Sequence, residues 1–94
     1  MRNILWYLIA GTNGGIMRAR ILLAIKDQPS NAHKIAKKLA IDYKTSRYHL
    51  ELLEKNKLLD TINKDKYGTV YILSAQLDAE WSQFNEMWKK LEKN

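Results

Sequence analysis

The chain has 94 residues, of which 46% are hydrophobic, a formal net charge of +6 and no cysteine. One compact domain is expected at this length, and the missing cysteines exclude disulfides, thiolate zinc sites and cysteine nucleophiles. The charge is uneven: residues 1–50 contain nine Lys and Arg against two acids, whereas residues 51–94 contain seven against eight. This asymmetry favours a polyanionic partner, either nucleic acid or an acidic membrane surface, although a solvated basic surface is the common alternative.

The N-terminal segment, residues 1–10, contains the apolar run ILWYLIA after a single arginine. Seven residues cannot span a bilayer, and no small-x-small cleavage site follows. We therefore expect an N-terminal arm or helix, no membrane partner and a cytoplasmic location. Trp6 is expected to pack against the C-terminal helix, of its own or a partner subunit. The sequence GTNGG then breaks the chain, and Asn13 can cap the next helix.

Two helices are predicted over residues 16–26 and 32–39. Pro29 ends the first helix, and Asn31 is the natural N-cap of the second helix. On the first helix, Arg18 and Arg20 are expected to point away from the apolar face. That face consists of Met17, Ile21, Leu22, Ala24 and Ile25. The second helix is expected to present three lysines outward: Lys34, Lys37 and Lys38.

The stretch over residues 42–59, DYKTSRYHLELLEKNKLL, predicts a longer helix that follows the helix over residues 32–39 after a short turn. Asp42 is placed to cap it, and Ser46 is a small inward residue that lets two helices cross closely. His49 also falls on the inward side, and Asn56 is expected to adopt a left-handed conformation that ends the helix. An eight-residue helix, a turn and a longer helix form a helix-turn-helix, and we interpret the longer helix as its recognition helix. An ordinary solvated core helix has the same amphipathic pattern and is the alternative.

Two β-rich runs follow, LLDTIN and TVYIL, joined by five residues with a turn glycine. This pattern predicts a hairpin, and a hairpin directly after a recognition helix is a wing. Its tip would carry Lys64, Lys66 and Tyr67, which suit phosphates or the edge of a minor groove. An ordinary polar hairpin tip is the alternative.

A C-terminal helix is predicted over residues 75–92, with Ser74 as its cap. Its apolar residues step by four, three, four and three, which is the seam of a helix packed along another helix. Packing within the subunit is one interpretation. A dimer contact is favoured because so small a domain has little other surface to cover these aromatics. The candidate dimer residues are Trp6, Leu77, Trp81, Phe84, Trp88 and Leu91.

The sequence contains no catalytic or metal-binding constellation. His33 lies on the lysine-rich face, and His49 is expected to be a packed neutral imidazole. Neither has a carboxylate at metal-ligand spacing, and the early glycines lack the lysine of a phosphate-binding loop. We therefore expect no enzyme, no cofactor and no metal.

Three segments together resemble a known family: GGIMRARIL, then PSNAHKIAKKL, then DYKTSRYHLELLEKNKLL with a wing. Over about residues 11–73 the chain resembles the ArsR-type winged-helix regulators, most closely a small archaeal group. The resemblance implies a dimeric transcription factor whose DNA-facing positions are Lys44, Thr45, Arg47 and Tyr48. Lys57 departs from the glycine that the family commonly has there. The metal-sensing cysteine and histidine ligands are also missing, which argues against metal sensing.

The prediction is thus a mainly α fold with a small β-hairpin, a winged helix-turn-helix forming one domain over residues 1–94. Residues 11–73 form its core, residues 1–10 an arm and residues 74–94 a dimerisation helix. The predicted function is sequence-specific binding of double-stranded DNA as a homodimer, for transcriptional regulation. A protein-interaction or assembly module is the main alternative, and single-stranded nucleic acid a weaker one. Candidate contacts to the DNA backbone are Lys34, Lys37, Lys38, Tyr43, Lys64, Lys66 and Tyr67.

Overall fold

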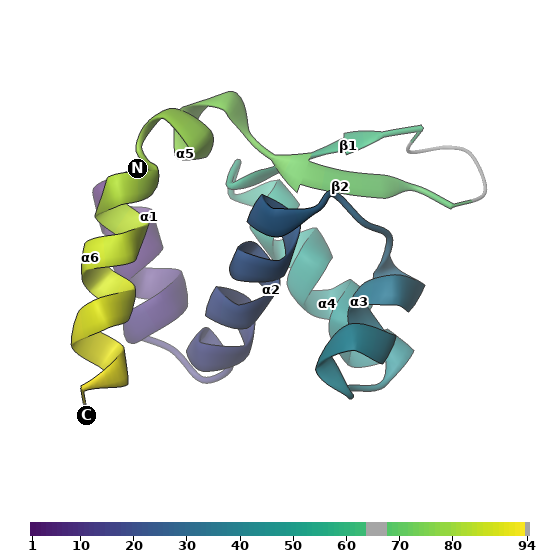
Figure 1. Cartoon of the computed structure of the whole chain (residues 1–94), viewed down its shortest axis with the longest axis horizontal. Coiled ribbons are helices and arrows are strands. Elements are labelled where there is room, and N and C mark those ends of the chain that lie inside the picture. The colour runs from purple at the N-terminus through teal and green to yellow at the C-terminus, as the bar shows by residue number, and fades with distance from the viewer. Residues whose placement is uncertain (64–67, 94) are drawn as a thin grey trace.

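Short helices and one hairpin follow each other along the chain in the computed structural model, which describes residues 1–63 and 68–93 (Figure 1). The predicted mainly helical fold with a small β-hairpin is confirmed. In chain order the elements are α1 (Arg2–Leu5), the π-helical turn η1 (Trp6–Ala10), α2 (Gly15–Asp27), α3 (Ala32–Leu39), α4 (Tyr43–Lys55), β1 (Leu59–Ile62), β2 (Val70–Leu73), α5 (Ala75–Ala79) and α6 (Trp81–Glu92).

The helix-turn-helix consists of α3 and α4, and each begins at the cap that the sequence predicts. The side chain of Asn31 accepts a 2.9 Å hydrogen bond from the backbone N–H of Lys34, and Asp42 accepts one of 2.8 Å from Thr45. Each cap satisfies a backbone donor that has no partner within the helix. Ser46 is fully buried, and its hydroxyl donates to the carbonyl of Ala32 at 2.8 Å. The small inward residue therefore lets the two helices approach and also links them.

The wing is a two-stranded antiparallel sheet in which Leu59 is opposite Leu73 and Ile62 is opposite Val70. A bridge between Ser30 and Tyr71 adds to it, with backbone hydrogen bonds of 3.2 and 2.7 Å. The segment between α2 and α3 is thereby attached to β2. The predicted wing-tip residues Lys64, Lys66 and Tyr67 lie outside the described residues.

The core forms where α2 packs between the helix-turn-helix and the terminal helices. Figure 1 shows α6 beside α1, with α2 between this pair and α4. The N-terminal run contributes Leu5, Leu8 and Ile9, which are at most 2% exposed. From the other end, Leu77 and Phe84 are fully buried in the same cluster. Both ends of the chain therefore help to hold the helix-turn-helix.

The predicted start and inner face of α2 are wrong in two respects. Its N-cap is Gly14, in a left-handed conformation with φ of 84°, and the side chain of Asn13 makes no cap. Arg18 does not point outward, because it is only 2% exposed. A guanidinium can be buried here since carbonyl groups and a hydroxyl surround it and accept its hydrogen bonds.

The end of α4 also differs from the prediction. Asn56 keeps a negative φ of −94°, and Lys57 takes the left-handed conformation with φ of 64°. The N–H of Lys57 donates to Glu54 at 2.9 Å and that of Leu58 to Leu53 at 3.0 Å, which is the Schellman pattern usually built on glycine. The turn is required because it places the fully buried Leu58 in the core.

The C-terminal helix is not continuous over residues 75–92. Ser74 caps α5 as predicted, accepting from the N–H of Leu77 at 3.1 Å, but the helix breaks at Glu80, where φ is −109°. The side chain of Gln83 then donates to Glu80 at 2.9 Å at the start of α6. The break allows both Leu77 on α5 and Phe84 on α6 to be completely buried.

Candidate nucleic-acid interface

Three of the four predicted base-reading side chains lie together on the outer face of α4. Lys44, Arg47 and Tyr48 are all exposed, and Arg47 and Tyr48 stand three and four residues after Lys44, so that they lie on the same side of the helix. Tyr48 is 61% exposed. The face combines two cations with an aromatic ring, the groups that contact phosphates and base edges.

The fourth, Thr45, takes part in the cap instead. It is only partly exposed, and its hydroxyl donates to the second carboxylate oxygen of Asp42 at 3.1 Å. The backbone and side-chain hydrogen bonds from Thr45 lower the pKa of Asp42, so the carboxylate stays charged at the positive end of the helix dipole. The structure therefore gives Thr45 a role in fixing where α4 begins.

Arg47 is restrained by an acid on its own helix. Its Nε lies 2.8 Å from Oε1 of Glu51, one turn further along α4. The hydrogen bond and charge of Glu51 raise the pKa of Arg47, with a smaller contribution from Tyr43. The ion pair orients the guanidinium along the helix and partly offsets its charge.

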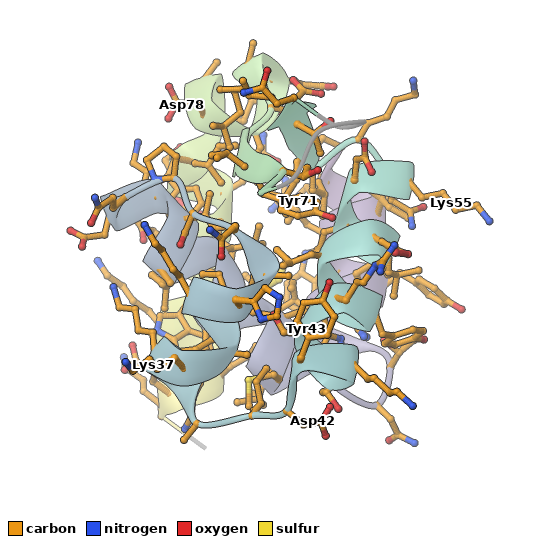
Figure 2. The ribbon with its side chains drawn as sticks, turned by 90° about the vertical axis from the view of Figure 1, so that its right-hand side faces the viewer. Lys37, Asp42, Tyr43, Lys55, Tyr71 and Asp78 are labelled. Carbon is orange, nitrogen blue, oxygen red and sulfur yellow. The ribbon has the colours of Figure 1, made fainter. Side chains whose placement is uncertain are left out.

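A second basic row lies on α3, next to the start of α4. Lys34, Lys37 and Lys38 are all exposed, and Nζ of Lys38 is 3.8 Å from Oδ2 of Asp27. Figure 2 looks onto this side of the molecule and shows Lys37 on α3 and Tyr43 where α3 and α4 meet. The ring of Tyr43 stacks on His33, with ring centroids 4.1 Å apart. Of the predicted backbone-contact residues that are described, Tyr43 therefore lies at the start of α4, whereas the three lysines lie on α3.

The partner of a buried histidine behind this face was missed by the sequence analysis. His49 is 6% exposed, and its Nδ1 lies 3.2 Å from Nη1 of Arg18. Burial first, and then the guanidinium, lower the pKa of His49. The inward, neutral imidazole was predicted, but its partner was not. The helical spacing contained the signal, since Arg18 lies three and four residues before Ile21 and Leu22 and so shares their buried face.

The predicted dimer residues divide into two groups. Leu77 and Phe84 have no exposed surface in their own chain, which corrects their assignment to an interface. Trp81 stacks on Phe84 with ring centroids 4.5 Å apart and remains partly exposed, as do Trp88 and Leu91. Trp6 is 39% exposed, and two other apolar side chains that the sequence analysis omitted are more exposed: Tyr7 at 59% and Ile16 at 47%.

The described residues contain neither a cluster of metal ligands nor a single helix that could span a membrane. They contain no group of three or more His, Asp or Glu side chains that could hold a metal ion. No single described helix is long and apolar enough to cross a membrane. Arg2–Ala10 and Gly15–Asp27 together have the length and apolar composition of a membrane span, but a bend of 119° separates them.

These elements define a winged helix-turn-helix fold, and solved structures share it. The chain is similar to BldR, a transcriptional regulator from Sulfolobus solfataricus, with a TM-score of 0.72 and 14% identity over 95% of this chain and 66% of that one. The chain is also similar to MarR from Staphylococcus aureus, solved in complex with salicylate and kanamycin. The TM-score is 0.72 and the identity 20%, over 97% of this chain and 63% of MarR.

A third similar structure was solved with nucleic acid. ZitR from Lactococcus lactis, in complex with DNA, has a TM-score of 0.62 and 21% identity, covering 78% of this chain. The match spans about half of ZitR, 51% of its length. No family model matches the sequence, and no curated protein does either. At these identities the likeness establishes the fold.

Proposed function

We propose that the chain is a sequence-specific regulator of transcription that binds double-stranded DNA as a homodimer. The observation that carries this proposal is the exposed row of Lys44, Arg47 and Tyr48 on a capped helix of a winged helix-turn-helix. In this fold the second helix of the motif enters the major groove, where its outward side chains meet base edges. The similar fold of ZitR, solved with DNA, supports the same assignment.

In this proposal the two helices divide the contacts. Arg47 has the shape to bind guanine through two parallel hydrogen bonds, which reads sequence. The exposed lysines of α3 and Lys44 contact phosphates, which fixes the position on the duplex without reading bases. Thr45 acts through the cap that it shares with Asp42. The wing, attached to the segment before α3 by the Ser30–Tyr71 bridge, is proposed to contact the backbone or the minor groove.

The proposed dimer would use the apolar surface left open by the terminal helices. Trp6, Trp81, Trp88 and Leu91 retain exposed area there, and aromatic side chains are enriched at protein interfaces. The ArsR-type resemblance of the sequence, including its small archaeal group, supports the same dimeric organisation. The missing cysteines argue that such a regulator would not sense metals through thiolates.

Selection of duplexes from a random pool tests sequence-specific binding. A regulator should enrich a defined sequence and bind it with an affinity that falls steeply as salt increases, because phosphate contacts release counterions. Neutralising Lys34, Lys37 or Lys38 singly should weaken binding to all sequences and reduce the salt slope by about one unit or less. Failure to enrich any sequence, with no salt dependence, would instead support a protein-interaction module.

A further inference from the structure

Three separate parts of the chain meet at one buried guanidinium. Arg18 on α2 donates from Nε to the carbonyl of Leu8 at 2.8 Å, and from Nη2 to the carbonyl of Asn13 at 2.9 Å and to the hydroxyl of Thr12. Its Nη1 faces Nδ1 of His49 on α4 at 3.2 Å. Arg18 and His49 are 2% and 6% exposed. The N-terminal segment is therefore connected to the proposed recognition helix through a single side chain.

This connection requires a neutral histidine. A guanidinium has only donors, so Nδ1 of His49 must accept, and the ring proton must be on Nε2. Protonation would place an N–H opposite an N–H and bring two buried cations to 3.2 Å. The backbone of Gly14 lies against one side of the ring, since a Cβ added at Gly14 would come within 2.8 Å of Cε1 of His49.

No described acid is positioned to offset the second charge. The groups that face His49 are Arg18 from α2 and Tyr48 on its own helix, whose ring centroid is 5.3 Å from that of His49. Tyr7 of η1 interacts with Arg18 and not with His49 itself. The acids of α4 have other partners: Glu51 binds Arg47, and Glu54 accepts from Thr61.

The other elements packed against α4 add no compensating group. On α3 the charged or titratable side chains are exposed: His33, Lys34, Lys37 and Lys38. On β1 the only one is the exposed Asp60. None of them contributes to the lowered pKa of His49, which has burial and Arg18 as its causes.

We propose that Arg18 and His49 form a proton-sensitive connection that holds the N-terminal segment to the recognition helix and releases it when His49 is protonated. The effect on DNA rests on the proposed function. Tyr48, on the outer face of α4, directly precedes His49, while the segment held by Arg18 continues from η1, which carries Trp6. Protonation of His49 therefore loosens α4 relative to the proposed dimer surface, and the affinity for DNA decreases as the pH falls.

The sign of this effect separates it from general electrostatics. Protonating an exposed histidine beside a DNA-binding face adds a positive charge and strengthens binding. His33 is such a residue, since it stacks on Tyr43 next to α4. A fall in affinity on acidification thus requires a structural change behind the face, at the buried histidine.

An NMR titration from pH 7.5 to 5 tests the connection without DNA, using wild type, His49→Asn and the matched control His33→Asn. The amide oxygen of Asn replaces Nδ1 as an acceptor but does not titrate. In wild type and His33→Asn, the His49 ring and the backbone amides of Thr12 and Asn13 should shift with one midpoint below the ordinary histidine value of about 6.5. In His49→Asn these amides should not respond. A His49 ring that titrates without moving them, or an unchanged response in His49→Asn, would overturn the proposal.

The second measurement is affinity for a selected duplex at constant ionic strength. Wild type and His33→Asn should lose affinity between pH 6.5 and 5.5 by up to about a hundredfold, which is the limit for two linked protons, one on His49 of each subunit of the proposed dimer, over one pH unit. His49→Asn should show no such loss, and a loss equal to that of wild type would overturn the link to α4. Absence of DNA binding at every pH would refute the proposed function alone, because the NMR titration decides the connection independently.

Discussion

Arg47 and Glu51 form an ion pair on the outer face of α4, with 2.8 Å between Nε and Oε1. Both side chains are more than half exposed, so the pair adds little to stability. Its consequence concerns recognition, because the acid holds the arginine along the helix axis and places a negative charge where phosphates would approach. The pair therefore restrains both the geometry and the strength of DNA binding.

Arg47→Ala should reduce affinity for the selected sequence more than for random DNA, by about 1–3 kcal/mol, because a two-bond contact to guanine is lost. Glu51→Gln should have the opposite effect on random DNA, strengthening binding by removing a like charge near the phosphates. Fluorescence anisotropy on both duplexes measures the two effects. Equal losses for Arg47→Ala on both DNAs would make it a phosphate contact, and Lys44→Ala provides that reference behaviour.

Two glycines with similar backbone conformations offer a matched pair. Gly14 and Gly68 have φ of 84° and 82°, but a Cβ at Gly14 would meet Cε1 of His49 at 2.8 Å and Nη1 of Arg18 at 3.0 Å, whereas one at Gly68 meets nothing within 4 Å. Gly68→Ala should cost only left-handed strain, about 1–2 kcal/mol. Gly14→Ala should cost about 1–3 kcal/mol more from overpacking, because the added Cβ must displace two buried side chains that are hydrogen-bonded to each other. Equal urea-unfolding free energies would contradict the tight packing.

Lys57→Gly should stabilise the protein by about 0.5–1 kcal/mol. Lys57 has φ of 64°, a conformation that glycine adopts without the Cβ strain of other residues, while part of the gain is offset by a more flexible unfolded chain. Lys55→Gly is the control, since Lys55 is the last residue of α4 and has a helical backbone, so the change should destabilise the protein, by up to about 0.5 kcal/mol. Thermal and urea unfolding measure both, and a Lys57→Gly protein less stable than wild type would show that the turn does not strain the lysine.

Stability should fall as pH decreases below about 6.5, the ordinary histidine value. The pKa of His49 is lower in the folded chain, so the unfolded chain takes up the proton first, and the stability present above that value is lost on acidification. Urea unfolding at a series of pH values should show this slope in wild type and not in His49→Asn. The lowered pKa of Asp42 acts in a separate window, because its stabilisation is lost only as pH falls below about 4. A flat profile between pH 6.5 and 5 would contradict the prediction.

Trp6→Asp should convert a dimer to a folded monomer. Trp6 is 39% exposed on the terminal helices, so a charge there would be buried in the proposed interface and solvated in the monomer. Sedimentation measures the mass of the particle, and circular dichroism shows whether it is folded. The contrasting variant is Phe84→Ala, which should unfold the chain because Phe84 is completely buried. A dimer should also select an inverted repeat with half-sites about 10 bp apart or a multiple of that. A wild-type monomer at tens of micromolar would reject the dimer.

The sequence by itself determined the local structure. Asn31, Asp42 and Ser74 each accept from a backbone N–H three residues further along, a contact complete within one helical turn. Lys44, Arg47 and Tyr48 share a face for a similar reason, because helical spacing alone decides their direction. The helix-turn-helix and the outer face of α4 could therefore be predicted without knowledge of distant contacts.

The tertiary structure decided where distant parts of the chain meet. Arg18 is buried because Leu8, Asn13 and His49, on two other segments, supply its acceptors, and no local pattern specifies that arrangement. Lys57 becomes left-handed because the next residue, Leu58, must enter a core built by other helices. The break at Glu80 likewise depends on what Leu77 and Phe84 pack against. Burial of such groups is a property of the assembled core, where hydrogen bonds and packing outweigh local preference.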